Sequence, residues 1–127
     1  MATIKSYTDI SQSKKLAEIL PLESADMVYV HTTDLEGDEH YDIDFRNNQP
    51  LFEDDIPAWN LAALLKVIPK HIKDYNVLRI DISENEFAIW YDEIGCGVNN
   101  GLPDITADNP VDACYEFVLK LNELNLL

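Results

Sequence analysis

Basic residues are scarce in this sequence. Nine Lys and Arg stand against 24 Asp and Glu, which leaves a net charge of −15 over 127 residues. Nine of the acids lie in residues 81–116, where there is no Lys or Arg, and eleven lie in residues 23–55, where Arg46 is the one base. A surface of this sign repels phosphate, so we expect no direct binding of nucleic acid or of an anionic membrane, and instead expect a basic protein partner.

Cysteine is equally sparse. Cys96 and Cys114 are too few for a disulfide framework, and their separation does not match a zinc or redox pair. Cys114 falls on the apolar face of an expected helix, which predicts a buried thiol. Cys96 stands between Gly95 and Gly97 near acidic residues, which raise a thiol pKa and make a poor nucleophile.

Long apolar runs are missing as well. No stretch approaches the ~20 apolar residues that a spanning helix needs. Residues 1–7 have no apolar signal core and no small-residue cleavage pattern. We therefore expect a soluble, cytoplasmic protein.

What the sequence does contain is enough apolar residues for a core. The hydrophobic share of 46% predicts one folded acidic domain over residues 1–127. We expect three helices, at residues 9–20, at residues 57–68 and from Asn109-Pro110 onward. Two hairpins are expected, one from residues 27–32 and 40–45, the other from residues 76–82 and 87–92, with a loop over residues 95–108. The order α-ββ-α-ββ-α predicts an α+β fold, in which an antiparallel sheet of two hairpins carries the helices.

Capping residues support the helix starts. Asp9 with Gln12 three residues later has the spacing of a capping box. Pro57 suits the first turn of the second helix, and Asn109 followed by proline suits the start of the last. The second helix is apolar almost all round, so Trp59 is expected to fill a second layer of core.

Alternation orients the hairpin residues. In the first hairpin, Tyr41, Ile43 and Phe45 are expected to face inward, and Asp42 and Asp44 to face water.

In the second hairpin, pairing of Ile82 with Phe87 sets Arg79 opposite Trp90. That pair is expected to stack as a cation–π contact.

No motif predicts catalysis. The chain lacks a Gly-rich phosphate loop, a Gly-x-Ser-x-Gly elbow and a recognisable Cys-His pair. We expect a protein that is not an enzyme and holds no cofactor and no metal. One enzymatic alternative stays open, a metal-dependent hydrolase using His31, His40 and neighbouring acids, although surface histidines in an acidic field explain the same residues.

The candidate partner contacts are outward acids and partly exposed apolar residues. They are Asp42, Asp44, Asp81, Glu84, Glu86, Trp90 and Leu119. A row of such carboxylates suggests mimicry of the phosphate row of DNA. An immunity or antitoxin-type inhibitor of a basic toxin is the alternative, and a charge that serves only solubility is the simplest explanation.

Two segments carry a resemblance. Residues 57–69 resemble a P-x-W-x-L-x-x-L-L-x-x-x-P block, and residues 109–116 resemble an N-P-x-[DE]-A block. In both blocks the chain is similar to a group of small acidic proteins that are encoded by phages and mobile elements of gut bacteria. That group has no assigned activity. The resemblance implies a prokaryotic context, a shared helix-strand-helix core and architectural roles for Trp59 and Asn109.

Overall fold

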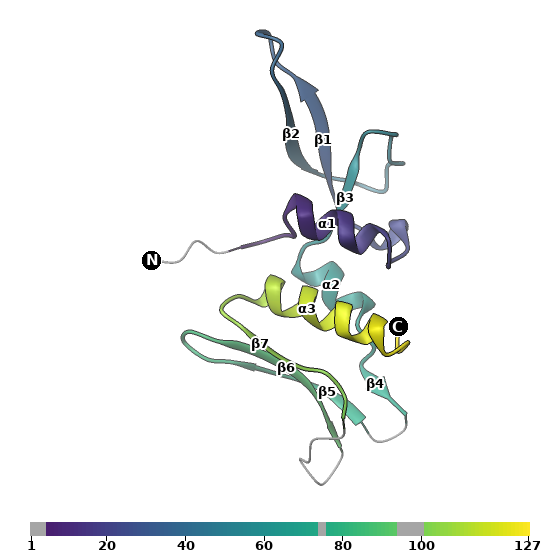
Figure 1. Ribbon diagram of the computed structural model, residues 1–127, viewed down its shortest axis with the longest axis vertical. Coiled ribbons are helices and arrows are strands. Elements are labelled where there is room, and N and C mark those ends of the chain that lie inside the picture. The colour runs from purple at the N-terminus through teal and green to yellow at the C-terminus, as the bar shows by residue number, and fades with distance from the viewer. Residues whose placement is uncertain (1–4, 74–75, 94–100) are drawn as a thin grey trace. The chain divides into compact units, whose positions relative to one another are not determined.

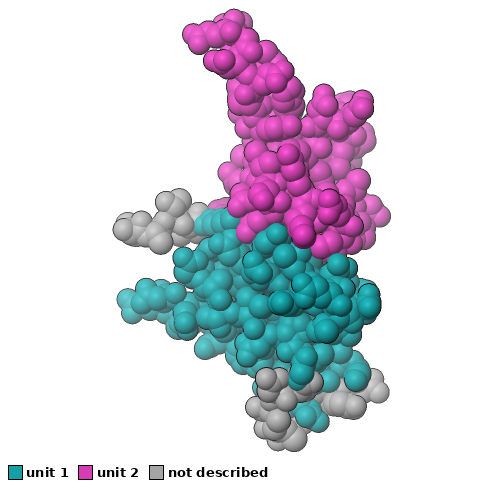
Figure 2. Space-filling view, viewed as in Figure 1, with its two compact units in different colours: residues 1–5, 64–127 teal, residues 6–63 magenta. Residues whose placement is uncertain are grey.

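The computed structural model describes residues 5–73, 76–93 and 101–127 and divides the chain into two compact units (Figure 2). Unit 1 comprises residues 1–5 and 64–127, and unit 2 comprises residues 6–63. The fold is α+β, with three α-helices and two separate antiparallel sheets of three and four strands (Figure 1). The predicted fold class is therefore confirmed, whereas the prediction of one sheet made of two hairpins is wrong. That residues 1–127 act as a single domain stays a prediction.

Unit 2 is built on a three-stranded antiparallel sheet. β1 (Met27–Thr33) lies between β2 (Glu39–Phe45) and β3 (Ile56–Ala58). β1 and β2 form the predicted first hairpin. At the base of this hairpin the core consists of Met27, Tyr29, Ile56 and Ala58, against which Tyr7, Ile10 and Ile43 pack.

The helix of unit 2 is α1 (Ile10–Ala17), which begins as the sequence predicts. The Asp9 side chain accepts a hydrogen bond from the Gln12 amide at 2.8 Å, and the Gln12 side chain accepts one from the Asp9 amide at 3.1 Å. This reciprocal capping box satisfies two amides that the first turn leaves without helical partners. The helix ends three residues before the predicted end at Leu20, and a 3₁₀ turn, η1 (Leu22–Ser24), follows Pro21.

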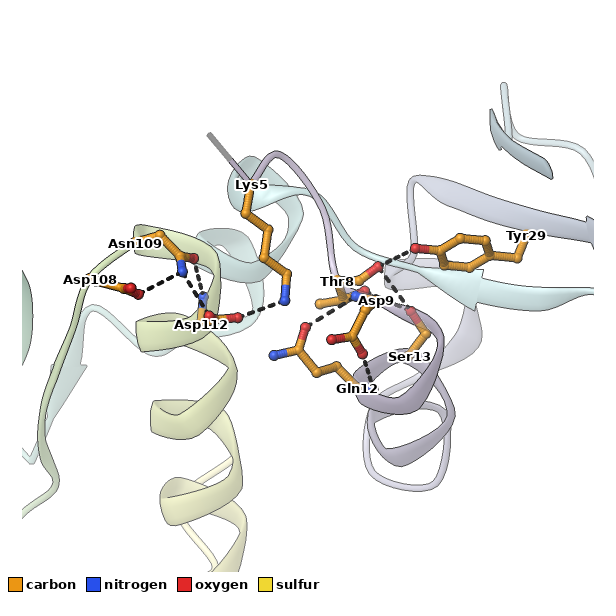
Figure 3. Close-up of polar contacts among 9 residues, drawn as sticks. All are labelled: Lys5, Thr8, Asp9, Gln12, Ser13, Tyr29, Asp108, Asn109 and Asp112. Atoms are coloured by element: carbon orange, nitrogen blue, oxygen red, sulfur yellow. Dashed lines mark hydrogen bonds and ion pairs between the residues drawn. The ribbon is translucent and has the colours of Figure 1, made fainter. Parts of the chain in front are cut away.

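A buried polar network joins α1 to the sheet of unit 2 (Figure 3). The hydroxyls of Thr8 and Ser13 are 2.7 Å apart, and the Tyr29 hydroxyl donates to the Thr8 carbonyl at 2.8 Å. The Trp59 amide donates to the Thr8 hydroxyl at 3.2 Å, and the Trp59 indole donates to the Ser24 hydroxyl at 2.9 Å. Trp59 is fully buried, which confirms that it belongs to the core. Because these polar groups are buried and still hydrogen-bonded, the network holds the chain at Thr8 in place against the sheet of unit 2.

The strand β3 corrects the predicted second helix. Pro57 lies in the middle of β3 and pairs with Val28, so it is not the first residue of a helix. Because β3 is an edge strand, a proline there removes no bond of the β1–β3 ladder as long as its nitrogen faces outward. The helix α2 (Leu61–Val67) starts later, where the Ala63 amide donates to the Asn60 side chain at 2.9 Å. The boundary between the units falls inside α2, after Ala63.

Unit 1 has a four-stranded antiparallel sheet. Its order is β4 (His71–Ile72), β5 (Asn76–Ile82), β6 (Phe87–Glu93) and β7 (Asp104–Ala107). The predicted β5–β6 hairpin and its register are confirmed, with Ile82 opposite Phe87 and Arg79 opposite Trp90. The predicted loop over residues 95–108 is wrong in part, because β7 occupies its second half; residues 95–100 lie outside the described residues.

One face of this sheet is covered by α3 (Pro110–Glu123) (Figure 1). The rings of Tyr91 and Phe117 lie 5.4 Å apart, and both residues are buried. The Asn109 side chain caps the helix by accepting from the Asp112 amide at 2.9 Å, as predicted. Lys5 binds the Asp112 carboxylate at 2.8 Å and so fastens the start of unit 1 to the start of α3 (Figure 3).

Among residues 5–73, 76–93 and 101–127, no helix is both long and apolar enough to cross a bilayer.

Candidate interaction surface

The densest group of exposed charge lies on the hairpin of β1 and β2, residues 27–45, here called the acidic hairpin. β3 pairs only with Met27–Tyr29, so the remainder of this hairpin is a two-stranded ribbon that extends past β3 in unit 2 (Figure 1). Residues 27–45 contain no Lys or Arg. They carry six exposed carboxylates: Asp34, Glu36, Asp38, Glu39, Asp42 and Asp44.

The tip of the acidic hairpin is ordered by one of these carboxylates. Asp34 Oδ1 accepts from the amides of Glu36 and Asp38, each at 2.9 Å. The Gly37 amide donates to the Asp34 carbonyl at 3.1 Å, and Gly37 has φ +87°, a left-handed conformation that favours glycine. These bonds hold the turn in one conformation, so the acids at the tip are presented by a structured loop.

Arg46, the one Arg or Lys in residues 23–55, directs its guanidinium at backbone carbonyls. Its Nη1 donates to Leu22 at 2.6 Å and to Ala25 at 3.1 Å, while Nε and Nη2 donate to Gln49 at 3.2 and 3.1 Å. The Arg46 side chain therefore links the segment before the acidic hairpin, at Leu22 and Ala25, to the segment after it, at Gln49. Sequence reasoning missed this role, although a single base among eleven acids was the available signal.

The two faces of β2 differ in character. Asp42 and Asp44 lie on one face and are exposed, as predicted. On the other face Ile43 packs against the core, but Tyr41 is 38% exposed and Phe45 is 63% exposed. The prediction that all three apolar residues face the core is wrong for Tyr41 and Phe45, because the core of unit 2 reaches β2 only at Ile43.

The two histidines of the hairpin lie on opposite faces. His31 pairs with Tyr41 across the ladder, whereas His40 pairs with Thr32, one position along. Directly opposed residues share a face and neighbours along a strand do not, so the rings point apart. The Nε2 atom of His31 lies 3.7 Å from Oε2 of Glu39, and the Nε2 atom of His40 lies 3.3 Å from Oδ2 of Asp42. The described residues hold no group of three or more His, Cys, Asp or Glu placed to bind a metal.

The other predicted contacts lie in unit 1 and are dispersed within it. Asp81 is exposed on β5, and Glu84 and Glu86 are exposed in the turn after it. Trp90 is half-buried on the sheet face opposite α3, whereas Leu119 is half-buried on α3 itself. Asp42 and Asp44 belong to unit 2. Only Asp42 with Asp44, and Asp81 with its turn, are thus brought together.

The predicted stacking of Arg79 on Trp90 is replaced by an ion pair. The two residues are directly opposed, but Arg79 Nε lies 3.7 Å from the Asp92 carboxylate. The strand register was readable from the sequence, whereas the choice of partner depends on side-chain direction.

The buried thiol and phenols belong to the cores. Cys114 is fully buried, as predicted, and burial raises the pKa of its thiol to about 12. Burial also raises the pKa of Tyr91, and burial with the nearby Tyr7 and Asp9 raises the pKa of Tyr29. A thiol held protonated in this way is a weak nucleophile. Cys96 lies outside the described residues.

Comparisons of the chain with protein-family models, with curated proteins and with solved structures found no match.

Proposed function

We propose that this protein is a non-enzymatic, cytoplasmic accessory protein that binds a basic protein partner through the acidic hairpin. The observation that carries the proposal is the set of six exposed carboxylates on residues 34–44, a stretch without Lys or Arg. Clustered charge of one sign raises the association rate of an oppositely charged partner.

Order in the hairpin supports the same function. The tip is fixed by the Asp34 hydrogen bonds, and the flanking segments are fixed by Arg46. A surface that is ordered before binding loses less conformational entropy when it meets its partner. Tyr41 and Phe45 add exposed aromatic surface, and aromatic residues are common at interface hot spots.

Spacing favours a basic protein surface of limited size over full mimicry of DNA. Asp42 and Asp44 are two residues apart on one strand face, which corresponds to about 6.8 Å. B-DNA carries a charge every ~1.7 Å of its axis. Nucleic-acid mimicry therefore needs carboxylates beyond this strand, and the proposal does not depend on it.

An inhibitor of a basic toxin is the second candidate. The exposed aromatic and acidic residues on one strand favour it, since such a combination supplies both affinity and charge complementarity. The resemblance to proteins of phages and mobile elements agrees with that role. A toxin gene beside the gene of this protein would favour it over a general accessory role.

The test is capture of partners from a lysate at rising salt, followed by identification of the captured proteins and affinity measurements. The variant Asp42→Asn/Asp44→Asn is compared with Glu53→Gln/Asp54→Asn, which removes the same charge from exposed positions of unit 2 outside the hairpin. We expect the hairpin variant to bind ~tenfold more weakly and with a shallower salt dependence.

The Glu53/Asp54 variant should bind like the natural chain. Equal loss in both variants, or capture of neutral and acidic proteins alone, would contradict the proposal. A third variant, Asp81→Asn/Glu84→Gln, measures what the second hairpin adds.

A further inference from the structure

The outer edge of β2 has no neighbouring strand among the described residues. The strand order β2-β1-β3 places β2 at the edge of its sheet along all seven of its residues. Unpaired edges of this length are sites where another extended chain can add to a sheet.

The ladder shows which backbone groups of β2 face outward. The Arg46 amide donates to the Asp26 carbonyl, and the Asp34 amide donates to the Asp38 carbonyl, so both ends of the ladder are hydrogen-bonded pairs. Bonded and non-bonded pairs alternate in an antiparallel ladder. The backbone N–H and C=O groups of three residues therefore bond to β1, and these are His40, Asp42 and Asp44.

The residues between them present their amides and carbonyls to the open edge. These are Glu39, Tyr41, Ile43 and Phe45, although the Phe45 amide already donates to Asp44 Oδ1 at 2.8 Å. The edge thus offers outward N–H groups at Glu39, Tyr41 and Ile43.

Other strand edges offer less. In unit 1, β4 and the Lys70 carbonyl, which accepts from the Leu78 amide at 2.9 Å, occupy the edge of β5 only as far as Leu78, which leaves the four residues Arg79–Ile82, and the edge strand β7 also has only four residues. The part of β1 that extends beyond β3 is only Val30–Thr33 and carries no acid. The edge of β2 is longer, with seven residues, and from Tyr41 to Phe45 its side chains alternate between aromatic or aliphatic and acidic.

Charge decides between possible occupants. A second copy would bring Asp42 and Asp44 of both chains to one interface, and each chain carries a net charge of −15. Like charges across a strand pair destabilise it. A segment with basic side chains on that face meets the same carboxylates favourably.

We propose that β2 accepts, by antiparallel strand addition, an extended segment of a partner protein in which basic and apolar residues alternate. This inference rests on the proposed function and specifies how the basic partner is held. The apolar residues of the segment lie opposite Tyr41 and Ile43 and exchange backbone hydrogen bonds with them. The basic residues lie on the face of Asp42 and Asp44, in the non-bonded pairs where opposed side chains are closest.

The probe is a short peptide of alternating lysine and valine, about as long as β2, with three matched controls. One control has the same composition with the lysines grouped together. The second is N-methylated on its valines, and the third is N-methylated on its lysines. Binding to the full chain is measured by fluorescence anisotropy of labelled peptides, and amide exchange of β2 is followed with and without peptide.

The alternating peptide is expected to bind better than the grouped one. N-methylation of the valines should weaken binding about tenfold to a hundredfold, because those amides face β2, whereas N-methylation of the lysines should leave it within about threefold. The amides of Tyr41 and Ile43 should exchange more slowly in the complex, while that of Asp42, already bonded to β1, should change little.

Equal binding of the two N-methylated peptides, any other ranking, or no binding of the alternating peptide overturns strand addition. The proposed function is judged separately by the Asp42→Asn/Asp44→Asn comparison with captured partners. Basic partners that depend on these acids, together with peptides that bind regardless of methylation, would keep the function and remove this binding mode.

Discussion

The two hairpins of this chain are alike in plan and differ in what covers them. β1–β2 and β5–β6 are both antiparallel pairs with seven residues in each strand, and both carry alternating apolar residues. In β6, Ile89 is fully buried and Phe87 is 5% exposed. In β2, Tyr41 is 38% and Phe45 is 63% exposed. The contrast is between two strands: β6 lies in a core, whereas much of β2 remains available for contact, as do Ile80 and Ile82 of β5, which are 41% and 74% exposed.

The difference arises from the neighbours of each strand. β6 is an inner strand between β5 and β7, and α3 covers its apolar face. β2 is an edge strand whose covered part is limited to the base of the hairpin, around Ile43. Alternation along a strand tells which side chains share a face, but it does not tell whether another element covers that face.

Two matched phenylalanines test this contrast with the largest expected effect. Phe87→Ala should lower the free energy of unfolding by ~3–5 kcal/mol, because it leaves a cavity in a packed core. Phe45→Ala should lower it by less than ~1 kcal/mol, since most of the ring already contacts solvent. Urea denaturation measures both, and equal losses would mean that β2 and β6 are covered to the same extent at these two positions.

Each unit contains one tryptophan, Trp59 in unit 2 and Trp90 in unit 1, which makes the readout specific. Trp90→Phe leaves a fluorescence signal from unit 2, and Trp59→Phe leaves one from unit 1. Coincident unfolding curves from the two variants would support the single domain that the sequence predicts. Separate transitions would contradict it.

The chain's two arginines extend the comparison. Arg46→Lys should lower the free energy of unfolding by ~2–3 kcal/mol, because an ammonium cannot reproduce the planar set of bonds to three carbonyls. Arg79→Lys should lower it by less than ~0.5 kcal/mol, since Arg79 is exposed and its ion pair with Asp92 is long at 3.7 Å. Thermal denaturation of the two variants gives the ranking, and the reverse order would refute the structural role of Arg46.

Local signals in the sequence were sufficient for some features and insufficient for others. The caps at Asp9 and Asn109 and the pairing of Ile82 with Phe87 follow from short-range patterns, and all are confirmed. The strands β3, β4 and β7 have two to four residues and are defined by their partners, so periodicity has too few positions to detect them. Pro57 was misassigned for this reason, since proline suits a helix start and an edge strand equally.

The candidate site was predictable only in part. The exposure of Asp42 and Asp44 follows from alternation on a hairpin. The open edge of β2 and the exposure of Phe45 depend on where other elements end, which no residue of β2 specifies.

Alkaline pH is expected to act on the core of unit 1 through Cys114. Its pKa of about 12 in the folded chain lies above the ordinary value of 9.0, so the protonated thiol is favoured by folding. The stabilisation is complete below pH 9 and is lost as pH rises from there towards 12. By about pH 10.5 the free energy of unfolding has fallen by ~2 kcal/mol.

Cys114→Ala should reduce this loss between about pH 9 and pH 12, as measured by urea denaturation across that range. The raised pKa of Tyr91 leaves a further loss above pH 10 in both proteins. An unchanged pH profile would show that the thiol is not held protonated by burial.

The smallest effects are expected at the helix caps. They compare the two units through the same kind of loss, since each substitution removes one side-chain acceptor from the first turn of a helix. Asp9→Ala removes the cap of α1 in unit 2, and Asn109→Ala removes the cap of α3 in unit 1. Each should lower the free energy of unfolding by ~1 kcal/mol, because one amide of the first turn loses its acceptor. Asp9→Ala should shift mainly the Trp59 signal and Asn109→Ala mainly the Trp90 signal if the units unfold separately. If each variant instead shifts both signals equally, the units unfold together, and the different exposure of the two hairpins exists within one cooperative structure.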